Sequence, residues 1–466
     1  MKKGMLSSRL FDSCVPENRI TGKEKILGYF MGPIAVMVMN AILSNYLNVY
    51  YTDVLKISTI WGGMFISLFP IVAKVLDVLT FIYMGLVVDR TRSRQGKARP
   101  WILFAAPLML ACMILLFVVP KGNENLTAIW IFISYTGFYA VAYTMYSTAH
   151  TLMVPLATRD DAERRALSTV ANTPGMAAGS LVAILFPCVI VPILGVVESR
   201  WVMAAIIIAV FSFPLMLFEF FFTRERVTTE TAEAGTKISL SEQLRCCIKS
   251  RSWVVLMIYL VVFNIVHALF STATFYYCNW VLGSYNDGHT QALFYALGQA
   301  PLGIGVVLCN PITKKLGKRN ALLGGMVIST LGVALCLLDP RNLTLVLAGQ
   351  FVRTVGLIPS TYMISSMLGD ALDDVERVSG KRCDGFSSSV FNCIITISGG
   401  LALCAFNFGI SHLGYQAPTA GSIPVQNPAI QSFLIFCVIG IQLIAYPLIG
   451  VLSRFFPKDK PKKPTA

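Results

Sequence analysis

The sequence predicts an all-α membrane protein, with twelve transmembrane helices arranged in two six-helix bundles. Of its 466 residues, 55% are hydrophobic and only 13% are charged, whereas soluble proteins carry about 25% charged residues. Apolar runs of about 20 residues, long enough to cross a bilayer, recur along the whole chain. Basic residues collect in alternate loops between these runs, as in multi-pass membrane proteins. This composition excludes an ordinary soluble enzyme, a disordered chain and a nucleic-acid-binding domain.

Twelve runs have the length and the low charge of a membrane-spanning helix. Prolines inside several of them predict kinks, because neighbouring helices can satisfy the carbonyl groups that a proline leaves free. The predicted spans lie near residues 26–51, 60–88, 100–120, 126–154, 168–195, 201–222, 253–281, 290–313, 320–338, 343–368, 385–412 and 428–453.

Most of the 38 Lys and Arg residues fall on one side of the predicted membrane. The opposite loops hold only Lys56, Lys121, Arg200 and Arg341. Short loops rich in Lys and Arg face the cytoplasm in most membrane proteins. The distribution therefore predicts cytoplasmic N and C termini, and hence an even number of spans.

The longest polar stretch between spans, residues 223–252, divides the chain into two halves. A cytoplasmic tail (1–25) and a six-helix bundle (26–222) precede this linker. A second six-helix bundle (253–454) and a short cytoplasmic tail (455–466) follow it. Two six-helix halves joined by a cytoplasmic linker describe the major facilitator fold, in which the halves rock around a site at the membrane midplane.

Two charged residues, Lys74 and Asp77, fall in the middle of the second span. An ionisable side chain at membrane depth costs about 2.5–3.5 kcal/mol and normally faces the bundle interior. The spacing of i and i+3 places both on one helix face, close enough to pair. The pair is either a structural lock, or it makes Asp77 a cation or proton site. Burial favours the protonated carboxyl and a nearby ammonium favours the ionised form, so movement of Lys74 would change the proton affinity.

Arg353 lies in the tenth span and cannot lose its charge. It requires a buried acceptor, which is a partner helix, a backbone carbonyl or an anionic substrate. Structural anchoring and substrate contact both stay open. Glu219 and Asp53 lie near span ends, where an interfacial position is the simpler prediction.

Polar side chains form stripes along four of the predicted spans. In the fourth span Tyr139, Tyr143, Ser147 and His150 are three or four residues apart and share one helical face. Similar stripes occur in spans one, five and seven. They indicate either interhelical hydrogen bonding or the wall of a polar cavity. The candidate substrate-binding residues are Asn40, Tyr143, Ser147, His150, Asn172, His267 and Arg353.

Several motifs carry a resemblance to a known family. They are GYFMG and YYTDV around the first span, VAKVLD, MGLVVDRTRSRQGKARPWIL, YTMYSTAHTLMVP, and GDALDDVE followed by GKRCDG. With these motifs the chain resembles the glycoside–pentoside–hexuronide:cation symporter family, to which melibiose permease belongs, over residues 22–455. The resemblance implies the major facilitator fold and alternating-access transport of a sugar or glycoside together with Na⁺, Li⁺ or H⁺. It also implies a monomer in the inner (cell) membrane of a bacterium.

The resemblance assigns cation coupling to Asp77, with Lys74 beside it. Thr144 falls on the family's assisting threonine, and Thr80 stands where many relatives have asparagine. Phe81 replaces the second carboxylate of sodium-coupled relatives. Na⁺ is a hard ion that prefers several oxygen ligands. The coupling ion is therefore H⁺ or Na⁺, with H⁺ favoured.

Two loops are candidate gates. The loop after the second span can bond the carbonyl ends of neighbouring helices, and the acidic loop after the tenth span matches the family's acidic loop. The candidate gating residues are Asp89, Arg90, Arg94, Lys97, Asp370, Asp373 and Glu376.

The predicted substrate pocket departs from that of the melibiose carrier. Met37, Ser147 and Asn172 stand where that carrier has two carboxylates and an arginine, which would supply charge-assisted bonds to sugar hydroxyls. An α-galactoside is therefore not favoured, and a different glycoside is the leading hypothesis. An uncoupled or export-type carrier of an amphipathic non-sugar solute is one alternative, and a membrane solute sensor is another.

Enzyme activity is not predicted. The sequence contains neither an HExxH nor a GxSxG motif. Its twelve cysteines show no metal-ligand spacing, so neither a metal site nor a cofactor is expected. The predicted partners are a small-molecule substrate and the lipid bilayer, without nucleic acid.

Overall fold

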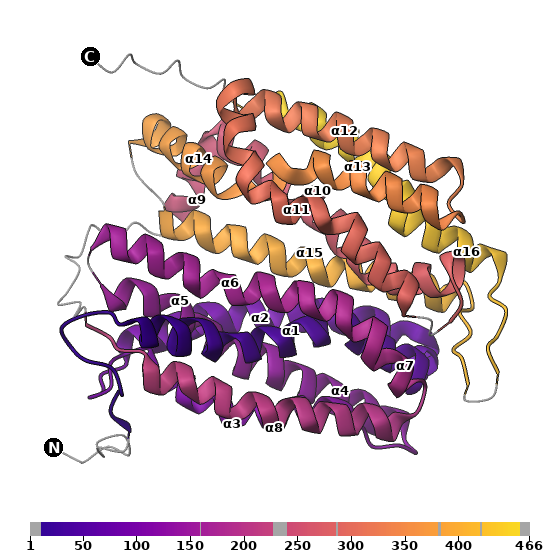
Figure 1. Ribbon diagram of the computed structural model, residues 1–466, viewed down its shortest axis with the longest axis horizontal. Helices are drawn as coiled ribbons and strands as arrows, with labels where there is room; N and C mark the ends of the chain where they lie inside the picture. Colours follow the sequence, from indigo (N-terminus) through magenta and orange to yellow (C-terminus); the bar gives the residue numbers. More distant parts are fainter. Residues whose placement is uncertain are drawn as a thin grey trace. The chain divides into compact units, whose positions relative to one another are not determined.

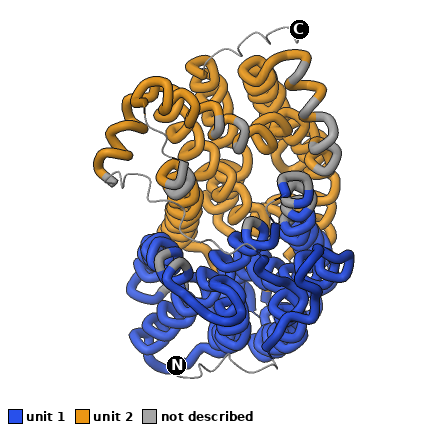
Figure 2. The backbone as a smooth tube through the Cα atoms, turned by 90° about the vertical axis from the view of Figure 1, so that its left-hand side faces the viewer, with its two compact units in different colours: residues 1–234, 417–422 blue, residues 235–416, 423–466 orange. Residues whose placement is uncertain are grey.

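The computed structural model describes residues 11–158, 160–226, 240–285, 288–380, 384–419 and 422–456, with some helical side chains in these ranges, including those of Asp89 and Asn172, left undescribed. The chain divides into two compact units, residues 1–234 with 417–422 and residues 235–416 with 423–466 (Figure 2). The division between residues 234 and 235 falls inside the predicted linker, 223–252. We call these the N-terminal unit and the C-terminal unit.

Between residues 11 and 226 the N-terminal unit is built from helices joined by short loops (Figure 1). Several of its helices join end to end through short π-helical turns, so they form longer continuous rods. The elements are η2 (Glu24–Met31), α1 (Gly32–Val49), η3 (Tyr50–Val54), η4 (Ile57–Gly63), α2 (Met64–Arg90), α3 (Arg99–Phe117), α4 (Glu124–Thr136), η5 (Gly137–Tyr143), α5 (Thr144–Ala157), α6 (Asp161–Leu185), η6 (Phe186–Ile190), α7 (Val191–Leu194) and α8 (Glu198–Phe222).

The C-terminal unit follows the same plan. Its described elements are helices; the isolated β-bridge between Thr419 and Ser422, in the loop before the last span, belongs to the segment 417–422 of the N-terminal unit. The elements are α9 (Leu240–Lys249), α10 (Arg251–Tyr277), η7 (Cys278–Leu282), α11 (His289–Leu316), α12 (Lys318–Leu338), α13 (Leu343–Tyr362), α14 (Ile364–Ser379), α15 (Asp384–His412), α16 (Pro428–Ile435), η8 (Phe436–Gly440) and α17 (Ile441–Ser453).

The predicted all-α membrane fold is confirmed. Eleven helices among the described residues are long and apolar enough to cross a membrane. The remaining predicted span, 290–313, lies within α11, a 28-residue helix with several undescribed side chains. Polar caps begin several spans: Asn123 accepts hydrogen bonds from two backbone N–H groups of α4, and Ser250 accepts one from Trp253 in α10. Such caps satisfy N–H groups that a helix cannot bond itself.

Helices α12 and α13 pack through glycines. Gly325 and Gly332 on α12 face Gly349 and Gly356 on α13, and each pair is seven residues apart, so each lies on one face. A Cβ atom on Gly332 would lie 2.6 Å from the carbonyl oxygen of Gly349. Lipid tails give little hydrophobic drive for helix association, so close backbone contact between small residues supplies much of the attraction.

We expect Gly332→Ala to destabilise the C-terminal unit by about 1–3 kcal/mol, because the added methyl group overpacks a contact between two backbones. Gly324→Ala is the matched control on the same helix, since a Cβ there meets no atom within 4 Å. The measurement is the thermal unfolding of both variants in detergent. Equal loss of stability in the two variants would contradict the role of this contact.

The residues that follow α8 fasten the beginning of the chain to the N-terminal unit. The carboxylate of Glu225 accepts hydrogen bonds from the backbone N–H groups of Lys97, Ala98 and Arg99, at 2.8–3.0 Å. It thereby satisfies the free donors at the start of α3 and complements the helix dipole. Arg226 donates to both carboxylate oxygens of the buried Glu24 and to the backbone carbonyls of residues 16, 17 and 19.

Candidate functional site

The Lys74–Asp77 pair lies on α2 as its spacing predicts. The ammonium Nζ of Lys74 is 2.7 Å from Oδ2 of Asp77, and the carboxylate side chain is only 4% exposed. The second carboxylate oxygen, Oδ1, is buried and has no hydrogen-bond partner among the described residues. A buried carboxylate oxygen without a donor is costly when it is charged. Asp77 is therefore an acid with one vacant acceptor position.

Two tyrosines provide Lys74 with a second set of contacts. The Nζ atom of Lys74 lies 4.2 Å from the ring centroid of Tyr139 and 5.7 Å from that of Tyr135. A cation above an aromatic face is attracted by the ring quadrupole, most strongly where water is excluded. The Lys74 ammonium is thus held by cation–π contacts as well as by the Asp77 carboxylate. Tyr135 was not singled out in the sequence, since its ring meets Lys74 only through the packing of α2 against α4.

A π-helical turn positions Tyr139. The turn η5 joins α4 to α5, and the hydroxyl of Thr144 donates to the carbonyl of Tyr139 five residues earlier, at 2.9 Å. Such turns insert one residue into a helix and shift the side chains that follow. The shift affects the span whose side chains surround Lys74.

The two predicted assisting threonines bond their own helices. Thr80 donates to the carbonyls of Leu76 and Asp77, and Thr144 donates to Tyr139. Neither hydroxyl proton is directed to the carboxylate of Asp77. Phe81 is half-buried on α2, in the place of the second carboxylate. Within the described part of the chain, no group of three or more His, Cys, Asp or Glu side chains could hold a metal ion.

Three candidate substrate residues, Asn40, Tyr143 and Ser147, are half-buried in the N-terminal unit. Tyr143 lies within electrostatic reach of Lys74. The side chain of the fourth candidate, Asn172, lies outside the described residues.

His150 differs from these candidates because it has a partner that the sequence did not indicate. Its Nδ1 atom is 2.5 Å from Oε1 of Glu219, and Tyr146 donates to the other oxygen of the same carboxylate. Glu219 lies near the end of α8, and its side chain is 0% exposed because α1 packs against α8 and Tyr146 and His150 of α5 bond its carboxylate.

In the C-terminal unit Arg353 is fully buried on α13. One guanidinium nitrogen donates to Gln442 and Tyr446 at 3.3 Å, and another to Thr354 at 3.5 Å, all of them neutral acceptors. The guanidinium carbon lies 4.2 Å from the ring centroid of Phe270. Its Nε has no hydrogen-bond partner, and the described residues place no carboxylate against it. Arg353 is thus a buried cation whose hydrogen bonds are long and go to neutral acceptors.

The other candidate from this unit, His267, has an exposed ring on α10. The ring stacks on Phe263, with centroids 6.3 Å apart and planes at 2°. Its exposure distinguishes His267 from the buried Arg353.

The predicted gating residues of the loop after α2 contact the start of the chain and the end of α8. Arg94 pairs with Asp12 at 2.9 Å, and the backbone N–H of Lys97 donates to Glu225. Arg90 is exposed at the end of α2, and the side chain of Asp89 lies outside the described residues. All of these contacts are within the N-terminal unit.

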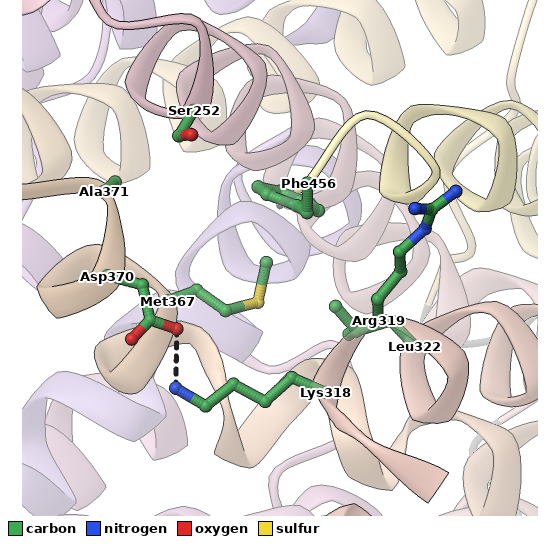
Figure 3. Close-up of a pocket in the computed structure, with 8 residues that line it drawn as sticks. All are labelled: Ser252, Lys318, Arg319, Leu322, Met367, Asp370, Ala371 and Phe456. Carbon is green, nitrogen blue, oxygen red and sulfur yellow. Dashed lines mark hydrogen bonds and ion pairs between the residues drawn. The ribbon is translucent and has the colours of Figure 1, made fainter. Parts of the chain in front are cut away.

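The acidic segment after the tenth span forms α14. Asp370 pairs with Lys318 at 2.5 Å, which joins α14 to the start of α12, while Asp373 and Glu376 are exposed. The pair lies at a small pocket of about 30 Å³ (Figure 3). This volume is far below the roughly 300–1,000 Å³ of a small-molecule site.

Asp374, which the sequence did not single out, makes a further link. Its carboxylate accepts from the Ser250 hydroxyl at 2.7 Å and also binds Arg377. Burial on its own raises the pKa of Asp374, but the hydrogen bonds from Ser250 and Arg377 outweigh it and hold the pKa below the usual value. The i, i+3 spacing of Asp374 and Arg377 indicates their ion pair in the sequence. Nothing in the sequence indicates the hydrogen bond between Asp374 and Ser250, the cap of α10.

Comparison with known proteins decides the family. A family model described as MFS/sugar transport protein matches residues 28–460. The chain belongs to the MFS/sugar transport protein family. The predicted relationship to the glycoside–pentoside–hexuronide:cation symporters is confirmed with it.

Relatives of this MFS/sugar transport protein extend over the whole chain. It is 26% identical to the isoprimeverose transporter of Lactiplantibacillus pentosus, over 96% of this chain and 91% of the relative. It is 28% identical to the inner membrane symporter YicJ of Escherichia coli (strain K12), over 93% and 91%. A solved bacterial homologue of the human lysosomal transporter Spinster has the same fold, with a TM-score of 0.65 at 14% identity, covering 93% of this chain and 96% of that structure.

The family settles the general nature of the protein. It is a multi-pass transporter of the cell membrane that moves a small-molecule substrate, and it is not an enzyme. Its membership of a symporter group indicates a coupling ion in place of a cofactor.

Proposed function

We propose that this transporter moves a sugar or glycoside together with a proton, by alternating access. The observation that carries the proposal is the buried carboxylate of Asp77, which has one oxygen bound to Lys74 and the other oxygen unbonded. In the low dielectric of the membrane such an acid favours its neutral form once its cationic partner moves away. Asp77 therefore binds and releases one proton as the position of Lys74 changes.

The cation–π contacts with Tyr139 and Tyr135 give Lys74 an alternative to the ion pair. A proton that binds Oδ1 of Asp77 converts the carboxylate to a neutral carboxyl group and removes most of the attraction that holds Lys74. The rings of Tyr139 and Tyr135 retain the ammonium through cation–π attraction. Proton binding is thereby linked to the position of a charged side chain between α2 and the fourth span.

Proton coupling fits this site better than sodium coupling. Na⁺ requires several oxygen ligands, whereas the described site supplies one free carboxylate oxygen. Phe81 adds no oxygen where a second carboxylate would supply one, and the described residues of this site offer no other carboxylate. A proton requires only the single vacant acceptor of Asp77.

Candidate substrate contacts are proposed for each unit by itself. Asn40, Tyr143, Ser147 and Asn172 of the N-terminal unit offer neutral hydrogen-bonding groups for sugar hydroxyls. For the C-terminal unit, the His267 ring and the Arg353 guanidinium are the proposed contacts, whereas His150 is bonded to Glu219 and is left out of this set. A guanidinium binds carboxylate groups as well as hydroxyl groups. Neutral glycosides and sugar acids are therefore the substrate classes to compare.

We also infer that both termini are cytoplasmic, because most basic loops lie on their side of the membrane. With this orientation the loop after α2 and the acidic α14 are cytoplasmic. Their ion pairs, Arg94 with Asp12 and Lys318 with Asp370, are proposed to hold the cytoplasmic ends of the helices in one state of the cycle.

Proton and sodium gradients applied to proteoliposomes test the proposal. We expect an inwardly directed proton gradient to drive accumulation of solute above its external concentration without added Na⁺. A sodium gradient at equal pH on both sides is expected to drive none. Strict dependence on Na⁺ would contradict proton coupling and the assigned effect of Phe81.

A further inference from the structure

A second ionisable cluster lies in the N-terminal unit, outside the Lys74–Asp77 pair. The Glu219 side chain on α8 is 0% exposed, and both of its oxygens are bonded to α5. One oxygen is 2.5 Å from Nδ1 of His150, and the other accepts from the hydroxyl of Tyr146. Tyr146 and His150 are four residues apart, so one face of α5 presents both groups to the same carboxylate.

The site is closed by a third helix. A Cβ atom on Gly32 of α1 would lie 2.6 Å from Cβ of Glu219 and 2.7 Å from its backbone nitrogen. Only a glycine allows α1 to approach α8 this closely, and the approach keeps water and lipid from the carboxylate. Among the described residues His150 is the one basic side chain that pairs with Glu219. An isolated buried charge is strongly unfavourable, so the Glu219 carboxylate needs the His150 partner.

The geometry identifies the proton that exchanges. Nδ1 of His150 faces Oε1 of Glu219 at 2.5 Å, and the backbone of Ala171 on α6 lies near the ring. An imidazolium donates from a ring N–H to a facing carboxylate, which fits this arrangement. Release of one ring proton leaves a neutral histidine and one buried negative charge. Because His150 is 13% exposed and Glu219 is 0% exposed, the proton enters and leaves through the imidazole.

The groups that face this pair come from α5 itself and from four other elements, η2, α3, α1 and α6. Tyr146 lies on α5, and Tyr29 on η2 is within electrostatic reach of Glu219. Arg99 on α3 donates to the carbonyl of Phe220, the next residue along α8. The contact of α1 is Gly32, and that of α6 is the backbone of Ala171. Neither tyrosine nor arginine changes its charge between about pH 5 and about pH 8, whereas a histidine does.

We propose that His150 and Glu219 form a proton-binding site of their own, which takes up and releases one proton through the His150 imidazole. Glu219 holds the imidazolium in place, and Tyr146 fixes the carboxylate. The inference rests on the proposed function only in that both proton sites belong to one carrier. It does not require Asp77 to be the coupling site.

Histidine NMR on the purified full-length protein tests proton binding directly. The chain has only four histidines, so ring-labelled histidine gives few signals, and the one missing in His150→Gln belongs to His150. We expect this signal to titrate in the wild-type protein. In Glu219→Gln its midpoint is expected to move down by about one pH unit or more, because the opposite charge that stabilises the imidazolium is gone. Thr151→Ala, on the exposed side of α5, is the matched control and should leave the midpoint unchanged.

Two results would overturn the inference. One is an unchanged His150 midpoint in Glu219→Gln. The other is a His150 ring that keeps one protonation state between about pH 5 and about pH 9 in the wild-type protein, and this measurement stands even if Glu219→Gln fails to fold.

Solute exchange at equilibrium separates this site from Asp77. In Asp77→Asn we expect exchange to retain a several-fold dependence on pH, which the double variant with His150→Gln loses. The same residual dependence in both proteins would remove the His150 site from the transport cycle and overturn its role there. If instead Asp77→Asn still accumulates solute while His150 titrates as expected, the proposed function fails and this inference stands.

Discussion

Asp77→Asn is expected to abolish uphill accumulation of solute while solute exchange continues. The amide has nearly the shape of the carboxyl group but cannot take up a proton in this pH range. It also removes the charge that holds Lys74, so the ammonium remains at the tyrosine rings in every state. Without a proton to bind, the gradient no longer drives transport, and solute in proteoliposomes should only equilibrate. Concentrative uptake under a proton gradient and counterflow without one measure the two activities.

Ser67→Ala is the matched control for this experiment. Ser67 is buried on the same helix, and its hydroxyl donates to the carbonyl of Gly63 at 2.8 Å, so the substitution removes a buried polar group without touching the ion pair. Both activities are expected to persist in this variant. Unchanged concentrative uptake in Asp77→Asn would exclude Asp77 from the coupling mechanism.

Arg353→Met is expected to reduce transport about tenfold or more without lowering thermal stability. Methionine fills a similar volume, and replacement of a buried charge by a packed apolar side chain is often neutral or stabilising. The bonds that would be lost are long and go to neutral acceptors. A guanidinium bonded to substrate contributes at least one charge-assisted hydrogen bond, which corresponds to about tenfold in affinity or more. The measurements are thermal unfolding and exchange of a neutral glycoside and a sugar acid.

Arg341→Met provides the comparison, since Arg341 is exposed in the loop before α13. It carries the same chemical change outside the membrane and is expected to leave transport unchanged. A large loss of stability in Arg353→Met, with exchange retained in the folded fraction, would show that Arg353 only anchors helices.

The sequence predicts the spans and the Lys74–Asp77 contact because both depend on short-range information. Length and apolarity define a membrane helix, and i, i+3 spacing alone brings two side chains of one helix together. The same local rule explains why Thr80 and Thr144 bond backbone carbonyls of their own helices. A hydroxyl group inside a membrane helix can always reach a backbone carbonyl of the preceding turn, whereas a partner on another helix depends on packing.

Contacts between helices could not be predicted in this way. Glu219 and His150 are 69 residues apart, and nothing along either helix indicates that α8 presents an acid to α5. The cation–π contact of Lys74 with Tyr135 depends likewise on the packing of α2 against α4. In both cases the partner is chosen by helix packing, and one sequence does not reveal it.

The attachment of residues 13–19 to the end of α8 bears on how the protein is made. Arg224 and Arg226 hold the backbone of a segment that leaves the ribosome some 200 residues before them; the hydrogen bond from Arg226 to Glu17, for example, spans 209 positions. During synthesis, residues 13–19 therefore lack their hydrogen bonds to Arg224 and Arg226 until the sixth span has been inserted. Completion of the sixth helix and closure of the first half of the carrier are therefore one event in its biogenesis.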